Sequence, residues 1–94
     1  MEGRPRLSLV LPAFNEEAGI RRAVAEADDA LGDLTADYEI LVVDDGSRDA
    51  TAAVVAELAR QRPRVRLLRH AVNRGYGAAL RTGFEAARDR KSVV

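Results

Sequence analysis

Short apolar runs alternate with segments of helical periodicity along this chain, and no other feature constrains its fold as strongly. The runs cover residues 7–13, 38–43 and 65–70 and are rich in the residue types that favour strands. Each run is followed by a segment in which apolar residues recur at helical spacing. Because helices that connect strands in this way form right-handed crossovers between parallel strands, we predict a βαβαβα order and a Rossmann-like, doubly wound α/β sheet.

The residues that flank the helical segments indicate where the first two helices begin and end. Asn15 is the predicted cap of the first helix, which we expect to run to about Leu31. The second helix is expected over residues 49–61, with Ser47 or Asp49 as its cap. The aspartates that follow the second strand, together with a glycine and a serine, have the composition of a turn.

The composition indicates one globular domain and excludes several classes of protein. Fifteen basic and fifteen acidic residues cancel, which argues against a nucleic-acid partner held by net charge. Without cysteine the chain has no disulfide scaffold, cysteine-based zinc site or thiol nucleophile. No apolar run approaches the ~18 residues that span a bilayer, so we expect a cytoplasmic protein. We expect residues 1–88 to form the domain and residues 89–94, which hold the only lysine, to be a non-native or frayed tail.

Loops suited to binding a nucleotide follow the three predicted strands. Because the carboxyl ends of parallel strands meet at one edge of a sheet, we expect these loops to converge on one crevice. Phe14 can lie against a base, and the carboxylate of Asp44 or Asp45 can accept a hydrogen bond from a base or a ribose. Backbone N–H groups of the glycine loop, residues 73–77, can meet phosphate oxygens at the start of the third helix.

Each of these features also has a purely structural explanation, which the sequence leaves open. Phe14 is equally consistent with a core residue, and the two aspartates with a turn and a helix cap. Gly75 and Gly77 could serve only a tight turn, and Arg74 could be a solvated surface residue rather than a phosphate partner.

Taken together, three blocks of sequence resemble one protein family. They are LVLPAFNEE at residues 9–17, ILVVDDGSRDAT at residues 40–51 and NRGYGAALRTG at residues 73–83. The blocks resemble the N-terminal, nucleotide-binding half of a family 2 glycosyltransferase, which implies a partial GT-A fold. The third block is similar to that of the polyprenyl-phosphate (dolichol-phosphate type) sugar transferases, and the resemblance covers about residues 7–88.

The resemblance implies that the chain binds a nucleotide-sugar donor, a UDP- or GDP-hexose. The full-length protein would transfer the hexose to a polyprenyl phosphate, or to another acceptor such as a glycan, and would associate with a membrane. Phe14 stands where the family more often has tyrosine, which keeps the stacking surface and loses a hydroxyl. The residues that the resemblance assigns to nucleotide-sugar binding are Pro12, Ala13, Phe14, Glu16, Asp44, Asp45, Arg74, Gly75 and Gly77.

The metal-binding motif of the family has no counterpart in this sequence. An Asp-x-Asp motif, which holds a divalent metal against the donor diphosphate, does not occur after Gly83, where Asp89 is the only aspartate. The resemblance therefore implies Mg²⁺ or Mn²⁺ in the full-length protein, with ligands outside this chain. It assigns no catalytic and no metal-binding residue here, and we expect the chain alone to transfer no sugar.

Three alternative classes share parts of this pattern. The acidic residues resemble those of a phosphoacceptor receiver domain, but a complete βα unit precedes them. The next aspartate after Asp49 is Asp89, in a predicted helix tail, and no lysine follows at a strand end other than Lys91. A dehydrogenase would carry G-x-G-x-x-G directly after the first strand, where residues 12–16 read PAFNE. A non-catalytic nucleotide-binding module with the same half-fold is the remaining alternative.

Overall fold

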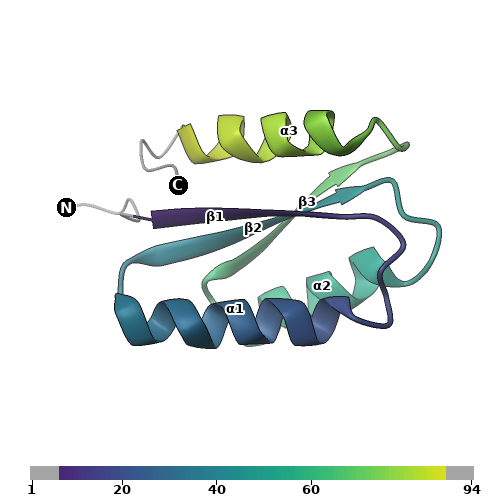
Figure 1. The fold of residues 1–94 in the computed structure, drawn as a ribbon. Coiled ribbons are helices and arrows are strands. Elements are labelled where there is room, and N and C mark those ends of the chain that lie inside the picture. Colours follow the sequence, from purple (N-terminus) through teal and green to yellow (C-terminus); the bar gives the residue numbers. More distant parts are fainter. Residues whose placement is uncertain (1–6, 89–94) are drawn as a thin grey trace.

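The computed structural model describes residues 7–88, and its elements follow the predicted order (Figure 1). The strands are β1 (Leu7–Ala13), β2 (Tyr38–Asp45) and β3 (Val65–His70). The helices are α1 (Ile20–Leu34), α2 (Thr51–Gln61) and α3 (Tyr76–Arg88). The predicted α/β class and βαβαβα order are therefore confirmed, whereas the tail predicted over residues 89–94 lies outside the described residues.

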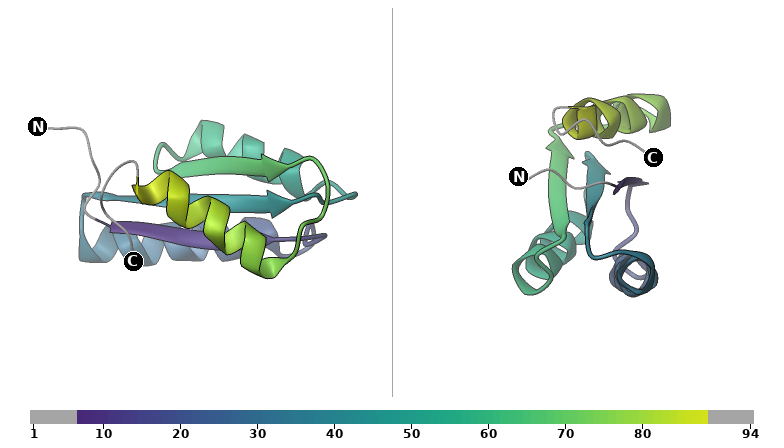
Figure 2. Two further views of the ribbon diagram at one scale, coloured as in Figure 1. Left: turned by 90° about the horizontal axis from the view of Figure 1, so that it is seen from above. Right: turned by 90° about the vertical axis from the view of Figure 1, so that its left-hand side faces the viewer.

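One parallel sheet, with the strand order β1-β2-β3, forms the middle layer of the described structure. Ala13 lies opposite Asp44 and Asp45 lies opposite His70, so the carboxyl ends of all three strands meet at the same edge. Helices α1 and α2 cover one face of the sheet and α3 covers the other, as both views in Figure 2 show. This arrangement gathers the loops that follow the strands at one edge, as expected for a doubly wound sheet.

The central strand β2 supplies both halves of the hydrophobic core. Ile40 and Val42 belong to the apolar cluster formed with α1 and α2, whereas Leu41 and Val43 belong to the cluster formed with α3. All eight residues of β2 are buried. Burial on both faces explains why this strand appears in the sequence as a continuous apolar run rather than an alternating one.

The first helix differs from its predicted bounds at both ends. Helix α1 begins at Ile20 after Gly19, which makes no side-chain capping bond, so the prediction that Asn15 caps this helix is wrong. Asn15 instead has a positive φ of 51° and lies in the loop before the helix. The helix continues to Leu34 rather than to Leu31.

The turn predicted after the second strand begins later than expected. Strand β2 extends through Asp45, so both aspartates belong to the strand and not to a turn. Pairing with β1 and β3 on the two sides explains the extension, because Asp44 is paired on both edges. Helix α2 begins at Thr51 with Ala50 as its N-cap residue, so neither predicted cap occupies that position. Asp49 nevertheless accepts a hydrogen bond from the Thr51 amide, at 2.9 Å.

Candidate functional site

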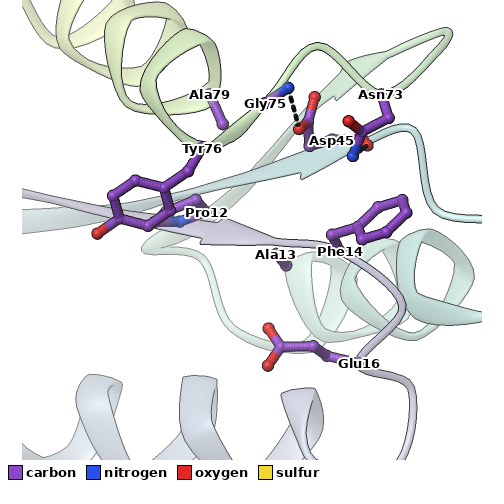
Figure 3. A pocket seen from close by; sticks show the side chains of 9 residues that line it. All are labelled: Pro12, Ala13, Phe14, Glu16, Asp45, Asn73, Gly75, Tyr76 and Ala79. Carbon is purple, nitrogen blue, oxygen red and sulfur yellow. Dashed lines mark hydrogen bonds between the residues drawn. The ribbon is translucent and has the colours of Figure 1, made fainter.

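A cavity opens at the carboxyl edge of the sheet, between the end of β1 and the start of α3. Its volume is about 530 Å³, within the range of cavities that hold small ligands. Figure 3 shows its lining side chains, which come from β1 and the loop after it, from the end of β2 and from the segment around the start of α3. They are Pro12, Ala13, Phe14, Glu16, Asp45, Asn73, Gly75, Tyr76 and Ala79.

Six of the nine predicted site residues line this cavity, although they come from three distant parts of the sequence. The six are Pro12, Ala13, Phe14, Glu16, Asp45 and Gly75. The other three, Asp44, Arg74 and Gly77, are not among its lining residues. The fold therefore brings most of the predicted residues together at the predicted edge of the sheet.

Phe14 is not a core residue. Its side chain is 44% exposed, which rules out the structural explanation that the sequence left open. Phe14 and Asn73 line both this cavity and a second cavity of about 360 Å³. Residues Ser47 and Arg48, from the turn before α2, border only the second cavity. An exposed aromatic ring between two cavities offers a flat apolar surface to a ligand.

Hydrogen bonds in both directions join the loop after β1 to the turn before α2. The amides of Asn15 and Glu16 donate to the hydroxyl oxygens of Ser47 and Thr51, at 2.8 and 2.7 Å. In return, the amide of Arg48 donates to Asn15 Oδ1 at 2.9 Å. These bonds satisfy amides that no helix or strand would satisfy, and they hold the backbone on which Phe14 is exposed.

The two adjacent aspartates face opposite sides of the sheet. Side chains alternate between the two faces of a strand. The Asp44 side chain therefore lies on the same face as Val42, toward α1 and α2, and the Asp45 side chain lies on the same face as Val43, toward α3. Asp44 is fully buried, and its Oδ2 accepts a hydrogen bond from the Ser47 amide at 3.3 Å. Among the described residues, nothing donates a hydrogen bond to Asp44 Oδ1. A buried acceptor without a partner is costly, so this oxygen is suited to a donor group that the described protein does not supply.

Asp45 organises the loop after β3. Its Oδ1 accepts hydrogen bonds from the Arg74 amide at 2.9 Å and from His70 Nδ1 at 2.7 Å. Its Oδ2 accepts one from the Gly75 amide at 2.8 Å, drawn as the dashed line in Figure 3. Its backbone oxygen accepts one from Asn73 Nδ2 at 3.2 Å. The Arg74 and Gly75 amides therefore already have an acceptor within the protein, and the contact of the loop with phosphate stays a prediction.

The hydrogen bonds also decide the charge of Asp45. Burial alone would raise the pKa of this carboxyl, but the hydrogen bonds from His70, Arg74 and Gly75 outweigh burial and lower the pKa below its ordinary value of 3.8. Asp45 is therefore an ionised, acceptor-only group at neutral pH.

This lowered pKa predicts a loss of stability in acid. The folded state releases the Asp45 proton more readily than the unfolded state, so its contribution to the free energy of unfolding is complete above pH 3.8 and is lost as the pH falls through the folded pKa. Urea unfolding between about pH 6 and about pH 2 should show this decline, and the free energy of unfolding should fall less steeply with pH in Asp45→Asn than in wild type. An equal dependence of stability on pH in the two proteins would contradict the lowered pKa of Asp45, since all other carboxyl groups are common to both.

Some residues at the site were not predicted from the sequence. Asn73 and Tyr76 belong to the glycine loop that was predicted to meet the ligand, but neither was named as a binding residue. Ala79 reaches the cavity because the first turn of α3 passes over it. Nothing local distinguishes His70, whose two ring nitrogens are both within hydrogen-bond distance of partners.

Two further features concern only the part of the chain that the structure describes. Within residues 7–88, no three His, Asp or Glu side chains gather closely enough to hold a metal ion. In the same range, no helix is both long and apolar enough to cross a bilayer.

A sheet of this topology, with a cavity at its carboxyl edge, is the arrangement of a nucleotide-binding α/β protein. The sequence of residues 8–94 matches Glycosyl transferase family 2, and the chain belongs to this family. The predicted resemblance is confirmed, and the receiver and dehydrogenase alternatives are excluded.

Relatives of known function share the chain's sequence over part of their length. It is 35% identical over 95 residues to the dolichyl-phosphate beta-glucosyltransferase of Dictyostelium discoideum, covering 94% of this chain and 29% of that protein. It is 41% identical over 83 residues to the undecaprenyl-phosphate 4-deoxy-4-formamido-L-arabinose transferase of Pseudomonas fluorescens, covering 84% and 24%. The chain thus spans less than a third of these relatives, both of which are named for polyprenyl-phosphate substrates.

A solved structure supports the same fold. The mannosyltransferase PcManGT of Pyrobaculum calidifontis, in complex with GDP-Man and Mn²⁺, superposes with a TM-score of 0.65. The two sequences are 27% identical, and the match covers 89% of this chain and 25% of that one. The three parallel strands and their helices therefore form part of a GT-A glycosyltransferase fold, as predicted.

Proposed function

We propose that this chain is the donor-binding part of a glycosyltransferase and that it binds a UDP- or GDP-hexose in the cavity at the carboxyl edge of the sheet. The full-length protein would transfer the hexose to a polyprenyl phosphate, or to another acceptor such as a glycan. The observation that carries this proposal is the cavity of about 530 Å³, lined by an exposed aromatic ring and by the first turn of α3. The names of the relatives support the choice of acceptor.

The described residues suit different parts of such a donor. The half-exposed ring of Phe14 can stack on a base. The unpartnered oxygen of Asp44 can accept a hydrogen bond from a base N–H or a ribose hydroxyl if the ligand reaches between the strand ends. Glu16 and Gly75 also line the cavity. Arg74 and Gly77 do not line it, but each is next in sequence to a residue that does.

The full-length protein would need groups that residues 7–88 do not contain. A divalent cation, Mg²⁺ or Mn²⁺, would neutralise the diphosphate that leaves when the sugar is transferred. No group of three such ligands gathers within the described residues, so we expect the ligands of this cation outside them and assign no step of the transfer to this chain. We propose a cytoplasmic protein that a lipid-linked acceptor would bring to a membrane surface.

Nucleotide binding by the chain tests the proposal. We expect the wild-type chain to bind UDP or GDP, and Phe14→Ala to weaken that binding by about 1–3 kcal/mol because a stacking surface is lost. Isothermal titration calorimetry with each nucleotide measures the effect. Leu34→Ala is the matched control, because Leu34 is also a large exposed apolar residue but lies at the far end of α1. A wild-type chain that binds neither nucleotide, or equal affinities for wild type and Phe14→Ala, would contradict the proposal.

A further inference from the structure

We propose that His70 and Thr82 are positioning residues of the donor site. They orient the Asp45 carboxylate, which in turn holds the loop after β3 in the shape that forms one wall of the cavity. This inference rests on the proposed function, because the wall can position a donor only if the cavity binds one.

The imidazole of His70 is fixed from two sides. It is 6% exposed, and it lies at the end of β3 directly opposite Asp45. Its Nδ1 is 2.7 Å from Asp45 Oδ1, and its Nε2 is 2.7 Å from Thr82 Oγ1 on α3. Because an ionised carboxylate only accepts, Nδ1 donates to Asp45, and Nε2 is left to pair with the Thr82 hydroxyl, which can donate or accept. The ring thus joins the ends of two strands to the helix that covers them.

Asp45 needs such a partner because its own torsion does not fix its orientation. The last torsion of an aspartate side chain is broad, so the carboxylate takes its direction from its hydrogen bonds. Only one orientation places Oδ1 within 2.9 Å of the Arg74 amide while Oδ2 lies 2.8 Å from the Gly75 amide. The bond from His70 to Oδ1 favours that orientation.

The loop held by Asp45 is part of the cavity. Asn73 and Gly75 both line it, and Gly75 has a φ of 101°, which its hydrogen bond to Asp45 helps to maintain. Tyr76 and Ala79 follow in the first turn of α3 and line the same cavity. A change in the Asp45 carboxylate would therefore move this wall without touching the residues on the β1 side.

Two substitutions of His70 separate its two contacts. The amide nitrogen of His70→Asn can take the place of Nδ1 and keep the donor to Asp45, whereas His70→Gln places its amide near the position of Nε2 and keeps only the Thr82 side. We expect His70→Gln to weaken UDP or GDP binding about tenfold, and His70→Asn to stay within about threefold of wild type. Calorimetry on the full chain measures both.

Amide hydrogen exchange distinguishes a positioning role of His70 from a general contribution to stability. In His70→Gln the Arg74 and Gly75 amides should exchange faster than in wild type, beyond any change in global stability. Ser8→Ala is the matched control, because Ser8 also lies on the α3 face and donates a buried hydrogen bond, to Glu39 Oε2 at 2.8 Å, at the opposite end of β1. It should lower stability without changing the exchange of these two amides relative to global unfolding.

The outcomes separate this inference from the function on which it rests. A wild-type chain that binds neither UDP nor GDP contradicts the proposed function, and this inference falls with it. Binding by wild type with an equal affinity in His70→Gln, or a loss no larger than that of Ser8→Ala, overturns this inference alone. If His70→Gln does not fold, Thr82→Val decides: a loss of about threefold supports the positioning role, and an unchanged affinity overturns it.

Discussion

Replacement of Gly46 by alanine is expected to lower the free energy of unfolding by more than about 3 kcal/mol and to abolish nucleotide binding. Gly46 has a φ of 74°, which disfavours any residue with a Cβ. An added Cβ would also lie 2.4 Å from Asn73 N and 2.4 Å from the carbonyl carbon of Val72. Both atoms belong to the backbone, so no side-chain rotation can relieve the clash. The loop after β3 would have to move away from the end of β2, and it would take one wall of the cavity with it.

Gly75→Ala is the control that separates the two costs at Gly46. Gly75 also has a positive φ, 101°, but an added Cβ there would meet no atom within 4 Å. Gly75→Ala should therefore show only the conformational cost, about 1–2 kcal/mol, in urea unfolding followed by circular dichroism. Equal losses in the two variants would show that the close approach of the two loops is not the source of the effect.

Removal of the Asp45 carboxylate should have the second-largest effect, a loss of about 3 kcal/mol in the free energy of unfolding. Asp45→Ala leaves the amides of Arg74 and Gly75 and the imidazole of His70 without their acceptor, at a residue that is only 3% exposed. Three orphaned donors cost more than the single deleted group, although their costs do not add fully.

Unfolding in urea and exchange of the Arg74 and Gly75 amides measure this effect together. Asp45→Asn should be intermediate in stability, because it keeps one acceptor but turns an NH₂ group toward the donors. The result would be contradicted if Asp45→Ala were no less stable than Ser8→Ala, which loses one buried hydrogen bond far from the cavity.

The strands and their order could be predicted because burial on both faces leaves a mark in the local sequence. The apolar run of β2 predicts a central strand, and every residue of this strand is indeed buried. The predicted end of β2 was wrong, because Asp44 and Asp45 have the composition of a turn but are paired in the sheet. Helix α1 was misplaced for a similar reason, since Asn15 bonds to the turn before α2 instead of capping the helix.

The candidate site was predicted in outline by position at the strand ends, and most of the predicted residues do line one cavity. Local periodicity was enough for this, because parallel strands must end at a common edge. The function of each polar group depended on the tertiary structure. Alternation in an extended strand sends Asp44 and Asp45 to opposite faces, and only the pairing with β3 and the packing of α3 bring His70 and Thr82 to Asp45. Hydrogen bonds between residues far apart in the chain leave no local pattern, so their partners could be identified only in the folded protein.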